Sequence, residues 1–158
     1  MQRRFLTAAA VALVVTGIAC GAGGVRPSYK PFPQASVDTV KGSPSAVIQE
    51  AASRVLAENM QTQWVSPAEG YLETQSYNVV TRQSGNVQNA DRESNVTIRV
   101  WADSIGGGLT RVTAEATVLR TSDGSVVGRA REAAVPPGHP GDTIVHHILQ
   151  GLKERFGR

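Results

Sequence analysis

The sequence contains one cysteine in 158 residues, and aromatic side chains make up only 5% of it. A single cysteine excludes an intrachain disulfide framework and any zinc site built from cysteines alone, because both need several sulfur atoms. The length suits one domain of ordinary size rather than two. We therefore expect one hydrophobic core without covalent crosslinks.

An excess of charge of one sign is also missing. The chain has 16 basic and 13 acidic residues, a net charge of +3. Arg3 and Arg4 belong to an N-terminal segment that we expect to be removed, and without them 14 basic residues face 13 acidic ones. This near balance, with the two signs interspersed, disfavours binding to nucleic acid.

Long uncharged runs are rare, and the one that stands out lies at the N-terminus. A short basic head is followed by Phe5 to Ala19, a stretch of Ala, Val and Leu without charge. This pattern is typical of a secretory signal. A helix of about 15 residues rises only about 22 Å, less than the roughly 30 Å of hydrocarbon in a bilayer. Residues 1–19 are therefore predicted to be a signal peptide rather than a permanent span.

The run ends in Gly17-Ile18-Ala19-Cys20-Gly21, which resembles the lipobox of bacterial lipoproteins. That family places small residues before a cysteine that becomes diacylated, and it prefers Leu, Val or Ile where this chain has Gly17. The resemblance implies that Cys20 is lipidated and that a membrane holds the protein through this anchor. Because Gly21 replaces the Asp that commonly retains such proteins at the inner membrane, the resemblance implies the outer membrane, facing the periplasm. The alternative is an ordinary cleaved signal that leaves Cys20 as a thiol.

The remainder divides into a tether and a folded body. Residues 20–42 are rich in Gly, Ser and Pro and predict a lipidated cysteine followed by a flexible tether. Residues 43–158 predict a single α+β periplasmic domain. Ser43-Pro44 has the form of a helix start, and an apolar stripe continues from there to Met60. A last helix is expected after an Asp142 cap, with an apolar stripe that ends at Phe156.

Strands are predicted between the two helices. Val96, Ile98 and Val100 alternate with polar residues, the period of a strand with one buried face. By such patterns we expect strands near residues 62–65, 71–81, 96–103, 111–118 and 125–135, joined by hairpin-type links and a surface loop over 84–94. The fold class is therefore an antiparallel sheet of about five strands, with an N-terminal and a C-terminal helix packed on one face.

Residues 44–78 carry a second resemblance. The amphipathic helix and the hairpin Trp64-Val65-Ser66-Pro67-Ala68-Glu69-Gly70-Tyr71-Leu72-Glu73-Thr74 look like the helix-grip domains of envelope lipoproteins, including an accessory lipoprotein of the outer-membrane barrel-assembly machinery. This resemblance covers about 35 residues and contains no catalytic motif. It implies a fold class more than a function.

The chemistry-bearing residues predict neither an enzyme nor a cofactor. His146 and His147 are adjacent on the last helix and cannot converge on one metal ion, and His139 lies in a Pro/Gly turn. No serine lies in a Gly-x-Ser-x-Gly motif, and Gly106-Gly107-Gly108 is followed by a strand rather than a helix. The carboxylates are interpreted as scattered and solvated; they include Glu69, Glu73, Glu115 and Glu132.

One surface is a candidate binding face. If the strands are neighbours, the sheet face opposite the core carries Arg99, Trp101, Arg111, Arg129 and Arg131. Arginine and tryptophan are enriched at binding hot spots, although a solvated sheet face has the same composition. A register slip of one residue would instead bury Trp101 in the core. The leading hypothesis is a non-enzymatic lipoprotein that docks to an envelope protein complex, and the alternative is a module that binds a lipid or envelope glycan between sheet and helices.

Overall fold

The computed structural model describes residues 26–85, 92–120 and 125–157. The predicted signal peptide, Cys20 and the turn over 121–124 lie outside these ranges. The elements in chain order are β1 (Ser36–Lys41), α1 (Pro44–Ala57), β2 (Thr62–Ser66), β3 (Tyr71–Thr74), β4 (Tyr77–Asn78), β5 (Gln83–Ser84), η1 (Arg92–Ser94), β6 (Asn95–Gly106), β7 (Leu109–Leu119), η2 (Gly128–Arg131), β8 (Glu132–Ala134) and α2 (Pro140–Phe156).

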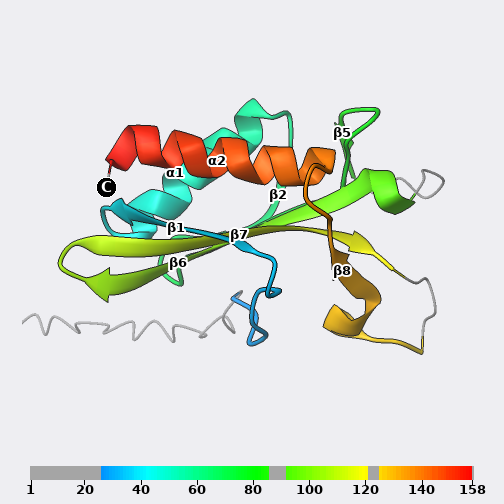
Figure 1. The fold of residues 1–158 in the computed structure, drawn as a ribbon, viewed down its shortest axis with the longest axis horizontal. Coiled ribbons are helices and arrows are strands. Elements are labelled where there is room, and N and C mark those ends of the chain that lie inside the picture. The colour runs from blue at the N-terminus through cyan, green and yellow to red at the C-terminus, as the bar shows by residue number, and fades with distance from the viewer. Residues whose placement is uncertain (1–25, 86–91, 121–124, 158) are drawn as a thin grey trace, which may run out of the picture.

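The strands form one antiparallel sheet with the order β1-β7-β6-β3-β2. The short β4 strand pairs with the first residues of β6, and β8 pairs with the last residues of β7. Both helices cover one face of the sheet, and the blue N-terminal segment lies on the opposite face (Figure 1). The protein is therefore α+β, with the layers that the sequence predicts.

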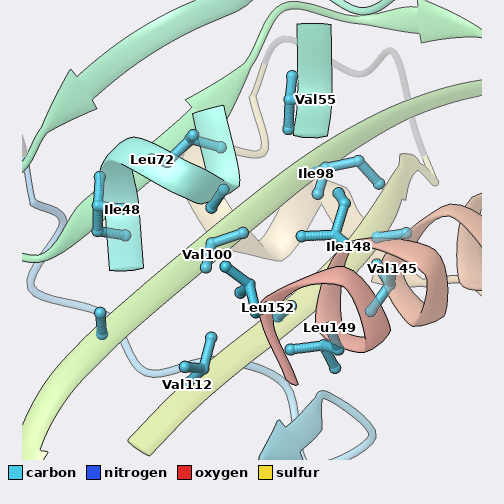
Figure 2. Packing of buried hydrophobic residues seen from close by; sticks show 14 of the residues in the cluster. Ile48, Val55, Leu72, Ile98, Val100, Val112, Val145, Ile148, Leu149 and Leu152 are labelled. Carbon is cyan, nitrogen blue, oxygen red and sulfur yellow. The ribbon is translucent and has the colours of Figure 1, made fainter. Parts of the chain in front are cut away.

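The core lies between the sheet and the two helices. Alternate residues of the central strands point into it, as their period of two requires. Figure 2 shows how Ile98 and Val100 of β6 meet Ile148 and Leu152 of α2, while α1 adds Ile48. All five side chains are at most 1% exposed. These side chains thus form the packed layer between the sheet and the helices.

The start of α1 and the hairpin after it agree with the sequence. The hydroxyl of Ser43 accepts a hydrogen bond from the Ala46 N–H at 3.3 Å, and Pro44 follows at the first helical position. In the β2–β3 turn, Gly70 has a φ of +63°, and a Cβ there would lie 2.2 Å from the carbonyl oxygen of Ala102. Only glycine fits this close approach of the turn to β6.

Several strand boundaries differ from the prediction. The described chain forms eight strands rather than about five. The single strand expected over 71–81 is two short strands, because the chain leaves the sheet after Thr74 and pairs again at Tyr77. The expected strand over 125–135 is a 3-10 turn followed by the short β8. Its small residues, among them Gly128 and Ala130, supply little apolar surface to hold a longer strand.

The last helix begins earlier than expected. The N-cap is His139, whose Nδ1 accepts a hydrogen bond from the Gly141 N–H at 3.0 Å, and Pro140 is the first helical residue. Asp142 is in the first turn, where it accepts from the Gly138 N–H at 3.0 Å. The prediction that Asp142 caps this helix is therefore wrong, since an imidazole nitrogen takes that place.

The tether prediction is wrong for the described part of residues 20–42. β1 is an edge strand that pairs with β7 along Ser36 to Lys41. Val40 of this strand is fully buried in the core. The three prolines that disfavoured regular structure all precede β1 in the chain. Residues 26–35, here called the N-terminal strap, pack on the outer face of the sheet.

Candidate functional site

The outer face of the sheet carries the residues that the sequence pointed to. Because Val96, Ile98 and Val100 face the core, the odd-numbered residues of β6 face the other way, as the predicted register requires. Arg99 and Trp101 are two of these. The strand register places Arg99 opposite Glu115 of β7, and Asp103 opposite Arg111. Oppositely charged residues in these positions stabilise a strand pair.

Two arginines of this face are locked in paired contacts with carboxylates. The guanidinium of Arg99 donates to both oxygens of Glu132, at 2.6 and 2.8 Å, and to Glu73 at 3.3 Å. The guanidinium of Arg129, from η2, donates to both oxygens of Glu115 at 2.6 and 2.8 Å. We call these five residues the ion cluster. Such two-pronged contacts are the strongest that arginine makes with a carboxylate.

The N-terminal strap covers the ion cluster. The backbone N–H of Phe32 donates to Glu115 at 2.8 Å, and the ring of Phe32 lies 3.8 Å from the guanidinium of Arg129. The ring of Tyr29 lies 4.7 Å from Arg129 and 5.6 Å from Arg99. These cation–π contacts remove the arginines from water, so the ion cluster is an interior feature rather than a solvated one.

The predicted binding face is therefore mostly inaccessible. Arg99 is 5% exposed and Trp101 is 2% exposed, although both point away from the core. Arg129 and Arg131 are half-buried, and the Nε of Arg131 is buried without a hydrogen-bond partner among the described residues. Arg111 alone of the five is largely exposed, with 53% of its side chain in contact with solvent. The structure brings Arg99 and Arg129 together and leaves Arg111 apart.

Three of the four carboxylates expected to be scattered converge instead, and the fourth, Glu69, contacts Arg26. Glu115 of β7 and Glu132 of β8 each contact both arginines of the ion cluster, and Glu73 of β3 contacts Arg99. The sequence holds part of this signal, because a hairpin closed by the glycines at 106–108 sets Arg99 opposite Glu115. The contribution of Glu132 depends on how β8 returns to β7, and no local pattern encodes that return.

Burial shifts the pKa values of this face. Burial would lower the pKa of Arg99, but its hydrogen bonds to Glu132 and Glu73 outweigh burial and raise that pKa above its ordinary value. Burial raises the pKa of Tyr71, and the hydrogen bond that the Tyr71 hydroxyl donates to Glu73 raises it further. Burial also raises the pKa of Tyr29. Near neutral pH Arg99 is therefore charged, and Tyr71 and Tyr29 are neutral.

An open groove lies beside the ion cluster. It is enclosed by the strap and by the parts of β6 and β7 nearest their hairpin, and its volume is about 700 Å³. Trp101 forms its floor and contacts the ring of Tyr71, with ring centres 5.5 Å apart. Arg26, from the strap, and Arg111 reach its rim and share the carboxylate of Asp103. The prediction missed the strap residues, because they lie in the range interpreted as a tether.

The histidines take structural positions. The Nε2 of His139 lies 3.0 Å from the carbonyl oxygen of Glu93, while its Nδ1 caps α2. His146 contacts Asp142 of its own helix, and His147 lies 3.5 Å from the Glu58 carboxylate at the end of α1. Two neighbouring histidines thus point to different partners, as their spacing on a helix requires.

Within residues 26–85, 92–120 and 125–157, no three His, Cys, Asp or Glu side chains are grouped so that they could hold a metal ion. In the same ranges, no helix has the length and apolar character needed to cross a membrane. The chain matches no protein-family model, and it matches no curated protein.

Proposed function

We propose that this chain is a lipid-anchored protein of the bacterial cell envelope that carries out no catalysis and docks to a protein partner. The lipobox resemblance around Cys20 supports the anchor, and Gly21 supports an outer-membrane location facing the periplasm. The order of helix, β2–β3 hairpin, antiparallel sheet and final helix supports a helix-grip-like domain. Within the ion cluster every carboxylate is bound to arginine, which suits a structural role better than acid–base catalysis.

The observation that carries the docking proposal is the outer edge of the sheet at β2. Trp64 is 46% exposed and its neighbour Val65 is 40% exposed, in a protein whose other tryptophan is buried. Among the described residues, β2 pairs with β3 on one side only. Tryptophan is the residue type most enriched at binding hot spots, and an open strand edge offers backbone groups to an incoming strand. We therefore assign docking to β2 rather than to the covered outer face.

The N-terminal strap determines how the domain is held. Arg26 is fixed to the folded body through Glu69 and Asp103. Only six positions separate it from Cys20, and six residues extend at most about 22 Å. An acylated Cys20 would therefore hold the domain close to the headgroups, whereas the predicted 22-residue tether would let it move away.

The test is site-specific photocrosslinking in the membrane-anchored full chain. A photoreactive residue at position 64 is expected to give one dominant adduct with a specific envelope protein, because Trp64 lies in the interface. The matched control carries the same photoreactive residue in place of Val127, which directly precedes η2 and is 77% exposed. The Trp64→Ala variant should copurify with much less of the same protein.

A second arm tests the anchor. After a high-salt wash, which screens contacts between charged side chains and lipids, Cys20→Ser is expected to move the protein from the membrane fraction to the soluble fraction, because two or three acyl chains hold a protein stably to a bilayer. Identical adducts from positions 64 and 127 would contradict docking through β2. An unchanged membrane fraction for Cys20→Ser would contradict lipidation.

A further inference from the structure

The groove between the N-terminal strap and the β6–β7 hairpin has the composition of an anion-binding site. Its lining includes three basic side chains, Arg26, Lys30 and Arg111, and one acidic side chain, Asp103. Asp103 pairs with Arg26 at 2.7 Å and more loosely with Arg111 at 3.6 Å. Lys30 is exposed and has no carboxylate partner among the described residues. The lining therefore carries two positive charges that its own carboxylate does not neutralise.

Arg26 is held in place before any ligand arrives. Arg26 donates from Nη1 to the carbonyl oxygen of Glu69 at 2.9 Å, and its backbone N–H donates to the Glu69 carboxylate at 2.8 Å. Asp103 orients the other side of the same guanidinium. A fixed arginine loses little conformational freedom when it binds an anion, and its planar group suits phosphate oxygens.

Much of the remaining lining is apolar, with Ser28 and Thr113 as its uncharged polar residues. Trp101 forms a buried floor, Tyr29 stands at one side, and the strap contributes Pro27 and Pro31. A groove with a few cations above an aromatic floor suits a ligand that joins an anionic group to a less polar body. Inorganic ions alone would make no use of this apolar surface.

The groove also lies at the end of the domain nearest the proposed anchor. Arg26 begins the described chain six residues after Cys20, and it contacts Asp103 close to the β6–β7 hairpin. Beyond Asp103 the hairpin continues to Ile105, which is 49% exposed, and to three glycines with open space around them. Figure 1 shows the strap beneath the same β6 and β7 strands that form this hairpin. This end of the molecule can reach the lipid headgroups.

We infer that the groove binds the phosphate of an anionic phospholipid headgroup in the membrane that carries the anchor. The inference rests on the proposed membrane location, but its chemistry does not depend on lipidation. Lys30 and Arg111 bind the phosphate oxygens, the preorganised Arg26 completes the site, and the walls accept the glycerol part of the lipid. Binding there fixes the orientation of the domain on the bilayer and leaves β2 free for a protein partner.

The experiment measures sedimentation with vesicles, using the chain from residue 20 onward with Cys20→Ser, which keeps every described residue and removes the acylation site. One set of vesicles is phosphatidylcholine alone and the other contains phosphatidylglycerol. We expect binding to the second set only. Each basic residue near an anionic surface contributes about 1 kcal/mol, so the double variant Lys30→Ala, Arg111→Ala should bind about thirtyfold more weakly.

The matched control is Arg92→Ala with Arg120→Ala, which removes the same charge from exposed residues beyond the opposite ends of β6 and β7. This control should lose much less affinity than the groove variant. Equal losses would show general electrostatic adsorption and overturn the assignment, as would an absence of binding to anionic vesicles. Thermal unfolding of both double variants should stay near that of the parent, because all four side chains are exposed.

A third arm separates lipid from soluble phosphate. Glycerol 3-phosphate in solution should bind far more weakly than the anionic vesicles, and equal affinity would overturn the lipid as the ligand. Because the anchor is absent from this experiment, its failure would leave lipidation of Cys20 to be decided by the fractionation test above.

Discussion

Removal of Arg99 tests whether the ion cluster stabilises the fold. The Arg99→Met variant keeps a long apolar side chain but leaves Arg129 as the one cation against Glu73, Glu115 and Glu132. Loss of one partner from a buried ion pair typically costs about 3 to 5 kcal/mol, because the remaining charge is desolvated without compensation. Arg99 is 5% exposed, so solvent screens these contacts little. We expect a loss of that size from the free energy of unfolding.

The measurement is urea denaturation followed by circular dichroism, with the midpoint and slope fitted separately. For a domain of this size, that loss corresponds to a fall in Tm of roughly 10 to 20 °C. The matched control is Arg111→Met, which removes an exposed arginine with one loose ion pair at 3.6 Å and should cost less than about 1 kcal/mol. A loss below about 1 kcal/mol for Arg99→Met as well would refute the reasoning.

A second substitution separates unpaired charge from lost packing. Adding Glu132→Gln to Arg99→Met removes one of the carboxylates that lost Arg99 as a partner, and it should recover part of the lost stability. The coupling between the two positions should lie within the range of about 0.5 to 3 kcal/mol found for groups in direct contact. Additive losses would mean that the two-pronged contact between Arg99 and Glu132 contributes little.

Three further predictions concern the β2–β3 turn, Tyr71 and the core. Gly70→Ala should destabilise the domain strongly, since its Cβ would lie 2.2 Å from the Ala102 carbonyl oxygen, whereas Gly107→Ala, at a similar φ in open space, should cost only about 1 kcal/mol by urea denaturation. Because the pKa of Tyr71 is raised in the folded state, the stability that this residue contributes is complete below its unfolded pKa near 10 and is lost as the pH rises above it. Tyr71→Phe should therefore reduce the decline of the free energy of unfolding above pH 10 by about 1.4 kcal/mol per pH unit. An unchanged slope would contradict this. Leu152→Ala should cost about 2 to 5 kcal/mol, measured by thermal unfolding, because Leu152 is fully buried between α2 and the sheet.

Local periodicity decided the elements that the sequence predicts well. The apolar stripe of α1 and the alternation of apolar and polar residues in β6 each lie within one short segment, so they determine which face of the element is buried. The same alternation placed Trp101 on the outer face correctly. The Ser43 cap and the Gly70 turn were predictable for the same reason, because a single residue type meets a single local requirement.

Tertiary structure alone decided which outer-face residues are accessible. Burial of Arg99 depends on the strap folding back over β6 and on Glu132 arriving from β8, both distant in the sequence. β1 was missed because Val40 is its one buried residue, so this edge strand carries no extended apolar pattern. Sequence by itself determined the helices, the central strands and their core face, since those signals are local. The covered ion cluster and the open groove exist only because segments far apart in the chain meet on one face of the sheet.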